Sequence, residues 1–344
     1  MKWVTRERPS SSEATKFQMI QRLLAALVLC LLSAAAAGAA TSPLVLEATI
    51  ALPDTSGRID HLDIDLARKR LFVVELGNGS VDVIDLASRN VIHRIAGLDE
   101  PQGVVYVPKS DLLVIACGGD GTVRIFAGSD FAPRGIVQLG DDADNARLDS
   151  DGNVVVGYGS GGLAVIDPVK AARIRDIPLP AHPEAFQLAG GRVYVNVPDA
   201  HQIDVADLGS GKVIAKWSTP SLSSNFSMAI GGNGRVAVAF RSPARLALFD
   251  PMTGQIASVA ETCADADDVF DDAKRQRYLV SCGAGAIDVF EATGGKLSLV
   301  ARMPTTSGAR TSLFVPALDR LFLAVRAGLI FGSNASIQIF RPVP

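Results

Sequence analysis

Apolar and polar positions alternate in short runs along this chain, and the runs recur at a regular interval. Each repeat ends in an apolar strand that a polar or turn residue closes. These strand ends are Val83–Asp85, Ile125–Ala127, Val165–Asp167, Val205–Asp207, Leu248–Asp250, Val289–Glu291 and Ile339–Arg341, which lie 40 to 50 residues apart. A period of ~40–45 residues with several short strands is typical of a β-propeller blade. The pattern predicts seven blades.

The first repeat shows the expected content of one blade. It holds four short apolar-rich runs (61–65, 71–75, 81–85 and 91–95), separated by turns of Gly, Asn, Ser and basic residues. The second run is almost entirely apolar, as expected of a strand covered on both faces. No amphipathic helical stretch interrupts the series. We therefore predict an all-β fold, a seven-bladed β-propeller with four-stranded blades.

The two ends of the repeat series complement each other. The chain ends at Pro344, directly after the third strand of the last repeat, so that blade lacks its fourth strand. The apolar segment Leu44–Leu52 precedes the first repeat and belongs to no complete blade. We expect this N-terminal strand to complete the last blade and close the ring, because closure removes the unpaired edges of an open array.

The first forty residues have a different composition from the repeats. A positive flank at Gln21-Arg22 precedes the apolar run Leu23–Leu32, and Ala and Gly dominate up to Ala40. This order is typical of a secretory signal peptide. We expect residues 1–40 to be that peptide, with 1–18 preceding a true start at Met19, and residues 41–344 to form a single propeller domain.

Cleavage near Ala40 predicts a periplasmic or secreted protein without stable membrane insertion; an uncleaved membrane anchor is the alternative. Export predicts an oxidising compartment. Cys263 lies just before the first strand of blade 6 and Cys282 ends its second strand. Antiparallel pairing would bring them together, so a Cys263–Cys282 disulfide is expected and Cys117 is expected to be free. The alternative is three buried thiols that behave as small apolar groups.

Charge and motifs exclude several functions. The net charge is −3, and no run of Lys and Arg occurs in the repeats, which argues against nucleic acid as a partner. The Gly-rich segments 118–121 and 159–162 lie between strands and are predicted to be hairpin turns, because a phosphate-binding loop would need a helix after it. The sequence has neither a Gly-x-Ser-x-Gly nucleophile motif nor a Cys-x-x-Cys-His haem motif.

Function in a propeller resides on loops and channel residues. The first strand of each blade lies against the central channel, so residues near its start should face one another at one mouth. Many of these residues are polar, which an apolar fold alone would not need. The candidate ligand-binding residues are Asp60, His61, Gln102, Asp144, Asn145, His182, Glu184, Asn225, Asp267, Asp268 and Arg310.

The residue types at this mouth allow three kinds of role. Oxygen atoms of Asn145, Glu184 and Asp268 would suit Ca²⁺ or another divalent ion. His61 beside carboxylates could bind a transition metal or act as a general base, and Arg310 could hold a carboxylate. A mouth that only caps strand ends and holds ordered water is the remaining alternative.

Short strings at the blade starts resemble a known group. They are Gly57–Leu62, Glu100–Gly103, Asp142–Asn145, His182–Phe186, Asp265–Asp268 and Gly308–Thr311. Over residues 44–344 the chain resembles the exported bacterial YncE-like proteins with YVTN-type, WD-repeat-like seven-bladed propellers. The resemblance implies the fold and a binding role in the periplasm, and it permits a lactonase. Blade 5 departs from the pattern, because Asn225-Phe226 offers no acid. The sugar lactonases with a Ca²⁺ site have six blades.

We therefore expect an exported propeller that acts as a binding or scaffold module for a small molecule, a metal or a protein at the channel mouth. The alternative is a metal-assisted hydrolase of lactones, with the ion held by Asn145, Glu184 and Asp268 and with His61 or Asp267 moving protons.

Overall fold

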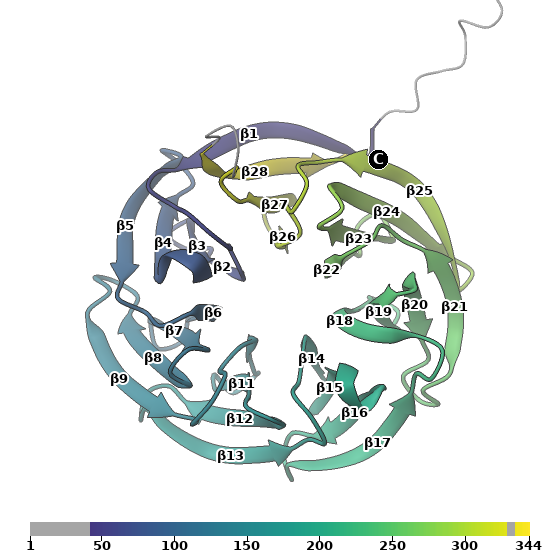
Figure 1. The fold of residues 1–344 in the computed structure, drawn as a ribbon, viewed down its shortest axis with the longest axis horizontal. Coiled ribbons are helices and arrows are strands. Elements are labelled where there is room, and N and C mark those ends of the chain that lie inside the picture. Colours follow the sequence, from purple (N-terminus) through teal and green to yellow (C-terminus); the bar gives the residue numbers. More distant parts are fainter. Residues whose placement is uncertain (1–41, 329–333) are drawn as a thin grey trace, which may run out of the picture. The chain divides into compact units, whose positions relative to one another are not determined.

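Seven four-stranded antiparallel sheets surround a central axis (Figure 1). The structure is a computed structural model, and it describes residues 42–328 and 334–344. Contacts divide the chain into two compact units, Met1–Thr41 and Ser42–Pro344. The first unit, and with it the expected signal peptide, lies outside the described residues. Within the described part there is no α-helix, only the 3-10 turns Leu76–Asn78 and Pro198–Ala200, and none of its segments is a helix long and apolar enough to cross a membrane.

Each blade runs from the axis outward in chain order. Blade 1 holds β2 (Leu62–Asp65), β3 (Arg70–Glu75), β4 (Ser80–Asp85) and β5 (Asn90–Ala96). Blade 2 holds β6 (Pro101–Val107), β7 (Leu112–Cys117), β8 (Thr122–Ala127) and β9 (Pro133–Gln138). Blade 3 holds β10 (Ala146–Leu148), β11 (Val154–Tyr158), β12 (Gly162–Asp167) and β13 (Ala172–Pro178).

The remaining blades repeat this order. Blade 4 holds β14 (Phe186–Ala189), β15 (Arg192–Val197), β16 (Gln202–Asp207) and β17 (Lys212–Ser218). Blade 5 holds β18 (Ser223–Ile230), β19 (Val236–Ser242), β20 (Ala244–Phe249) and β21 (Ile256–Glu261). Blade 6 holds β22 (Ala266–Asp272), β23 (Arg277–Cys282), β24 (Ala286–Thr293) and β25 (Lys296–Pro304). Blade 7 holds β26 (Ser312–Val315), β27 (Arg320–Val325), β28 (Ala335–Pro342) and the N-terminal β1 (Leu44–Leu52).

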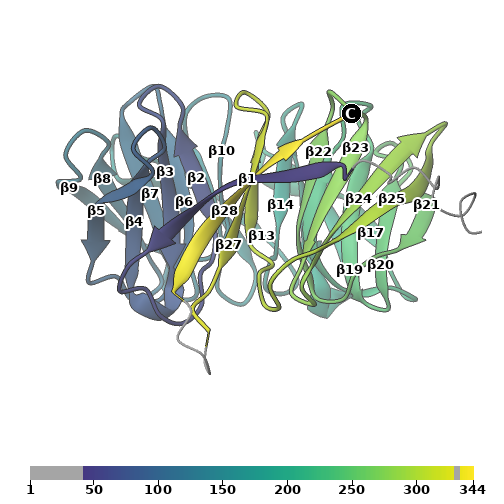
Figure 2. The same ribbon diagram turned by 90° about the horizontal axis from the view of Figure 1, so that it is seen from above.

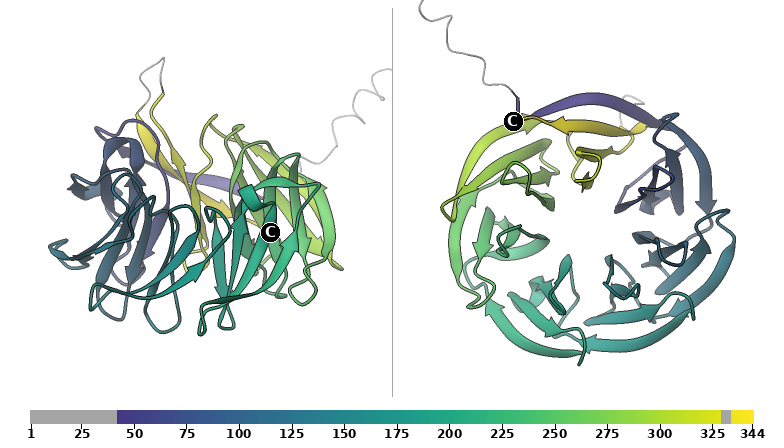
Figure 3. Two further views of the ribbon diagram at one scale, coloured as in Figure 1. Left: turned by 60° about the horizontal axis from the view of Figure 1, so that its bottom comes forward. Right: turned by 180° about the vertical axis from the view of Figure 1, so that it is seen from behind.

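The N-terminal strand closes the ring, as the sequence predicts. β1 lies antiparallel to β28 along its whole length, from the pair Leu44↔Pro342 to the pair Leu52↔Ala335 (Figures 1 and 2). Ile50 and Leu52 are almost fully buried against blades 7 and 1. The view from behind shows the same closed ring (Figure 3). Burial of these side chains and pairing with β28 join the two ends of the propeller non-covalently.

The polar residue that closes the third strand has a structural role in the repeat. Carboxylates of Asp85, Asp167, Asp207 and Asp250 accept hydrogen bonds from backbone N–H groups of the turn that follows. These hydrogen bonds from the backbone to the Asp side chain stabilise the turn, a role that a backbone–backbone hydrogen bond would otherwise have. They also lower the pKa of Asp85, Asp167, Asp207 and Asp250. The recurring Asp in the sequence motif is therefore a turn residue rather than a site residue.

Every outermost strand carries an irregularity in its pairing. The register shifts once between the third and fourth strand of each blade, and the extra residue lies on the outer strand. Ile92, Ile174 and Ile214 are such extra residues in blades 1, 3 and 4. A bulge leaves a residue unpaired and twists the strand. The rim of the propeller is thus a poor template for pairing with another chain.

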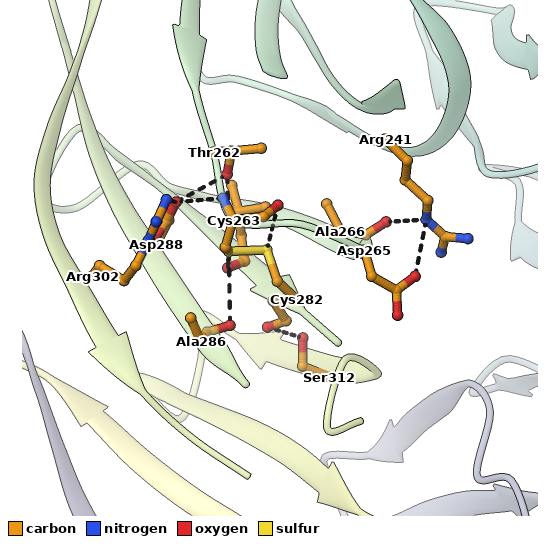
Figure 4. The surroundings of a disulfide bond; sticks show 12 residues. Arg241, Thr262, Cys263, Asp265, Ala266, Cys282, Ala286, Asp288, Arg302 and Ser312 are labelled. Atoms are coloured by element: carbon orange, nitrogen blue, oxygen red, sulfur yellow. Dashed lines mark hydrogen bonds and ion pairs between the residues drawn. A yellow bond between two sulfur atoms is a disulfide. The ribbon is translucent and has the colours of Figure 1, made fainter. Parts of the chain in front are cut away.

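Blade 6 contains a disulfide between Cys263 and Cys282, whose Cα atoms are 5.8 Å apart (Figure 4). This is the pairing that the sequence predicts, and Cys117 is a free, buried thiol. The Cys263 backbone N–H donates to Asp288, which is also held by Arg302 and by Thr262 (Figure 4). The disulfide and this network fix the segment that leads from blade 5 to the channel.

Candidate functional site

The seven innermost strands enclose an axial cavity of about 740 Å³. Its lining is mainly charged at the end where the first strands begin, and contains Leu148, Phe270 and Leu313 further along. Seven carboxylates and four guanidinium groups line it, together with two imidazoles. A cavity of this size with convergent polar groups is the usual form of a small-molecule site.

Strand pairing separates the mouth residues into two rings. In blades 2, 5 and 6 the register skips one residue, namely Gln102, Phe226 and Asp267. In blades 1, 3 and 4 the matching residue donates its N–H to the second strand: Asp60 to Val74, Asp144 to Gly157 and Glu184 to Asn196. The outer ring, with one residue from each blade, is Asp60, Gln102, Asp144, Glu184, Phe226, Asp267 and Arg310.

The residues that follow along the chain form the inner ring: His61, Gly103, Asn145, Ala185, Ser227, Asp268 and Thr311. The candidate mouth residues were chosen by their distance along the sequence, so they include members of both rings. The separation matters because an outer-ring residue and the next inner-ring residue occupy different positions in the mouth.

Ten of the eleven expected mouth residues line this cavity, and Asn225 does not. Asn225 is fully buried, and its amide donates to the side chain of Asn196 and to the backbone oxygen of Gln202. The expectation for Asn225 was therefore wrong by one residue. The bulge in β18 turns Phe226 toward the channel instead, where the guanidinium of Arg241 lies 3.8 Å from the ring centre.

Ion pairs neutralise the cations of the mouth. Arg241 pairs with Asp267 and lies 3.4 Å from Asp265 (Figure 4). Arg310 pairs with the same two acids at 2.7 and 3.1 Å. Across the ring, Arg58 donates to both oxygens of Asp60 at 3.0 and 3.1 Å. The Arg310 side chain, expected to be free to hold a carboxylate ligand, is thus already held by two acids.

Acidic and imidazole groups dominate blades 1 to 4. Burial opposes protonation of His61, but the charges of Asp60 and Asp144 raise its pKa. Interaction with Asp144 raises the pKa of His182 to about 9, and the Nδ1 atom of His182 lies 2.6 Å from the Gly159 oxygen. Burial opposes ionisation of Asp144, yet His182, His61 and Arg58 together lower its pKa.

Three channel carboxylates have no cationic partner within ion-pair distance among the described residues. Burial, with the nearby charge of Asp144, raises the pKa of Glu184 to about 8. Burial and Asp267 raise the pKa of Asp268 to about 7, although Asp268 accepts the Ser312 N–H at 2.6 Å. Burial also raises the pKa of Asp63 to about 6. Perturbed acids gathered in a cavity are common at functional sites.

The expected metal ligands were Asn145, Glu184 and Asp268, and all three line the cavity. In the described part of the chain, the acids and imidazoles whose ligand atoms come within 4.8 Å of one another are instead Asp60, His61 and Asp144. The structure thus favours a metal-ligand set different from the expected one.

The sequence analysis did not anticipate Arg58, Arg147 and Arg241. Arg241 is the second-last residue of β19 and follows Phe240, the partner of Asn225; the equivalent residues in blades 2, 3 and 6 are Gly118, Gly159 and Gly283. A basic residue at a position otherwise used for a turn was a signal in the sequence. Arg147 lies inside the channel wall, where burial lowers its pKa, and no sequence pattern distinguishes it.

Comparisons with known proteins support the fold but do not assign the chain to a family. No family model matches the chain, and no curated protein matches it. Chains of known structure that match it number 1746, so the fold alone does not select a function. A chain of the "Crystal Structure of Mitotic Checkpoint Complex" matches with a TM-score of 0.75 and 14% identity, covering 87% of this chain and 92% of that one. This likeness shows the fold: the chain is a seven-bladed β-propeller, an architecture that generally serves as a scaffold or for binding.

Proposed function

We propose that this propeller binds a small cationic molecule in the axial cavity. The observation that carries the proposal is a pair of cavity acids, Glu184 and Asp268, that lie outside every ion pair of the described residues. Arg58, Arg241 and Arg310 are already paired with acids, whereas Glu184 and Asp268 are not paired with a cation. An entering cation would favour the ionised form of both acids.

The test uses 1,4-diaminobutane, with uncharged 1,4-butanediol as the matched control, in the presence of a chelator. Calorimetric titration should show binding of the diamine and none of the diol. Glu184→Gln with Asp268→Asn should weaken diamine binding at least about tenfold, because both unpaired acids lose their charge. The exposed Asp130→Asn change should leave binding unaltered. Equal binding of diol and diamine would contradict the proposal.

Export forms a second part of the proposal and rests on the N-terminal composition and the disulfide. A stable Cys263–Cys282 bridge is typical of proteins in oxidising compartments. The mature chain should begin near Thr41 in the periplasm or outside the cell. Intact-mass measurement checks this, and a mass that retains residues 23–40 would indicate an anchor. The YncE-like assignment is proposed on the same basis as before, the strings at the blade starts.

The second candidate is a metal-assisted lactonase in which Asp268 moves protons instead of holding the ion, because its pKa of about 7 suits a proton carrier near neutral pH. Asp268 lies beside Asp267 in the same mouth. Hydrolysis of γ-butyrolactone, followed by acid release, should then occur with added divalent ions and be lost in Asp268→Asn. Absence of turnover with every ion tested would eliminate this candidate.

A further inference from the structure

Three side chains from two non-adjacent blades meet at the mouth. The ligand atoms of Asp60, His61 and Asp144 all lie within 4.8 Å of one another. Asp60 and His61 start blade 1, and Asp144 starts blade 3, so only the closed ring brings them together. Around one ion with bonds of ~2.0–2.2 Å, neighbouring ligand atoms lie about 3–3.5 Å apart. Rotations that move side-chain tips by roughly 1 Å would therefore close this cluster around an ion.

Unsatisfied oxygens adjoin this cluster. The Oδ1 atoms of Asp144 and Asn145 are buried and, among the described residues, have no hydrogen-bond partner. Asn145 is only 3% exposed, and it lines the cavity. A buried polar atom without a partner is unfavourable. A bound cation would satisfy the Asp144 oxygen, and Asn145, the next residue along the chain, is the candidate for a further donor.

Neighbouring groups hold the cluster in a form suited to an ion. Arg58 donates to both oxygens of Asp60, which fixes the orientation of that carboxylate. The His61 Nδ1 atom lies 3.2 Å from the Gln102 backbone oxygen. The same nitrogen lies 3.8 Å from Asp60 Oδ1, and an imidazole binds a metal through a nitrogen that carries no proton.

We propose that Asp60, His61 and Asp144, with the Asn145 side-chain oxygen as a fourth donor, bind one divalent transition ion of the Zn²⁺, Co²⁺ or Mn²⁺ type. An imidazole combined with carboxylates favours these ions, whereas Ca²⁺ takes six to eight oxygen ligands. The inference deepens the proposed cation-binding function and rests on the same cavity. A ligand entering the cavity would then meet both the ion and the unpaired acids Glu184 and Asp268.

The test uses metal ions alone on the purified full chain, stripped with a chelator and dialysed. Calorimetry and visible absorption should show one equivalent of Co²⁺, displaced by Zn²⁺, with Ca²⁺ at least about 100-fold weaker. Asp144→Asn and His61→Gln should each weaken Co²⁺ binding at least about tenfold, a loss usual for altered metal ligands and their partners. Asp130→Asn is the control, since it removes an exposed acid outside the cavity; its effect should stay below about threefold.

Any of three results would overturn the site: no stoichiometric Co²⁺ binding by the unaltered chain, tighter binding of Ca²⁺ than of Zn²⁺, or Co²⁺ binding by both ligand variants that is as tight as in Asp130→Asn. Circular dichroism checks that each variant is folded. Should a ligand variant unfold, Asp60→Asn gives the second measurement and should likewise weaken Co²⁺ binding, because it removes the charge of another proposed ligand. The diamine titration is run with chelator, so its outcome is independent: metal binding can fail while diamine binding holds, and the reverse.

Discussion

Two sets of acids in this propeller, one fully buried and one partly exposed in the channel, differ in how their charge is compensated. In the blade interiors, Asp82 and Asp288 are fully buried, and each accepts two hydrogen bonds from one guanidinium, that of Arg94 or Arg302. In the channel, Glu184 and Asp268 have no such partner, and burial raises their pKa to about 8 and about 7. The interior acids are part of the fold. The channel acids are held in an unfavourable environment that an incoming cation would relieve.

This difference distinguishes acids that stabilise the fold from acids that are available to a ligand. A paired acid contributes to stability mainly because removal of its partner leaves a buried charge. An unpaired acid at a cavity lowers stability whenever it is ionised, and it persists where a ligand compensates for that cost. The two sets should therefore respond in opposite ways to neutralising substitutions.

The largest change in unfolding free energy is expected when a paired acid of the blade interiors loses its partner. Arg94→Met leaves Asp82 buried without its partner and also removes the bonds to the Pro53 and Asp54 oxygens. We expect a loss of about 3 kcal/mol in unfolding free energy, the scale of a broken buried ion pair. Urea denaturation measures it, with the exposed Arg89→Met change as control. A loss below about 1 kcal/mol would place Asp82 with the channel acids.

Loss of the disulfide should come next. Replacing Cys263 and Cys282 by alanine opens a loop of 19 residues, which is expected to cost roughly 3 kcal/mol or somewhat less. Cys263 also donates to Asp288 through its backbone, so the change tests how firmly that interior acid is held. The same urea experiment applies, with Cys117→Ala as the single-thiol comparison. Unchanged stability on reduction of the unaltered protein would contradict the structural role.

Glu184→Gln should stabilise the protein, whereas the two changes above destabilise it. The folded-state pKa of about 8 exceeds the ordinary value of 4.5, so the folded state retains a proton that the unfolded state has lost. Stability of the unaltered protein must therefore fall as pH rises from about 4.5 to about 8. The neighbouring charges that set this shift are Asp144, His182, Asp267 and Arg241.

Gln carries no such penalty, so Glu184→Gln should match the unaltered protein at pH 5 and exceed it at pH 9. The expected gain is at least about 1 kcal/mol, which corresponds to a shift of one pKa unit. Thermal unfolding at both pH values, with chelator present, measures it. A variant that is less stable at pH 9 would show that Glu184 is a structural acid like Asp82.

The smallest effect is expected from a substitution that completes the pairing of one buried acid, Asp204. Asp204 is fully buried and lies opposite Lys216, as Asp82 lies opposite Arg94 and Asp288 opposite Arg302. Its Oδ2 atom has no hydrogen-bond partner in the described residues. Lys216→Arg supplies a two-pronged donor and should stabilise the fold by about 0.5–1 kcal/mol. Lys212→Arg on the same strand is the control, and a stabilisation equal to the control's would refute the reasoning.

The sequence predicted most of the ring because blade repeats and strand alternation are local patterns. The closing strand β1 could be inferred by counting, since one blade lacked a strand and one strand lacked a blade. The Cys263–Cys282 pairing followed from antiparallel geometry alone. The mouth was harder: Asn225 was placed there, whereas the bulge in β18 buries Asn225 and turns Phe226 to the channel.

What the sequence determined by itself is the set of strands and their order, because side-chain periodicity of two and turn residues act within a few positions of the chain. What only the tertiary structure decided is which side chains meet at the axis. A bulge of one residue reverses the direction of a side chain, and no local pattern records it. The cluster of Asp60, His61 and Asp144 depends in addition on ring curvature, which turns the starts of blades 1 and 3, on either side of blade 2, toward each other and follows from the packing of all seven blades.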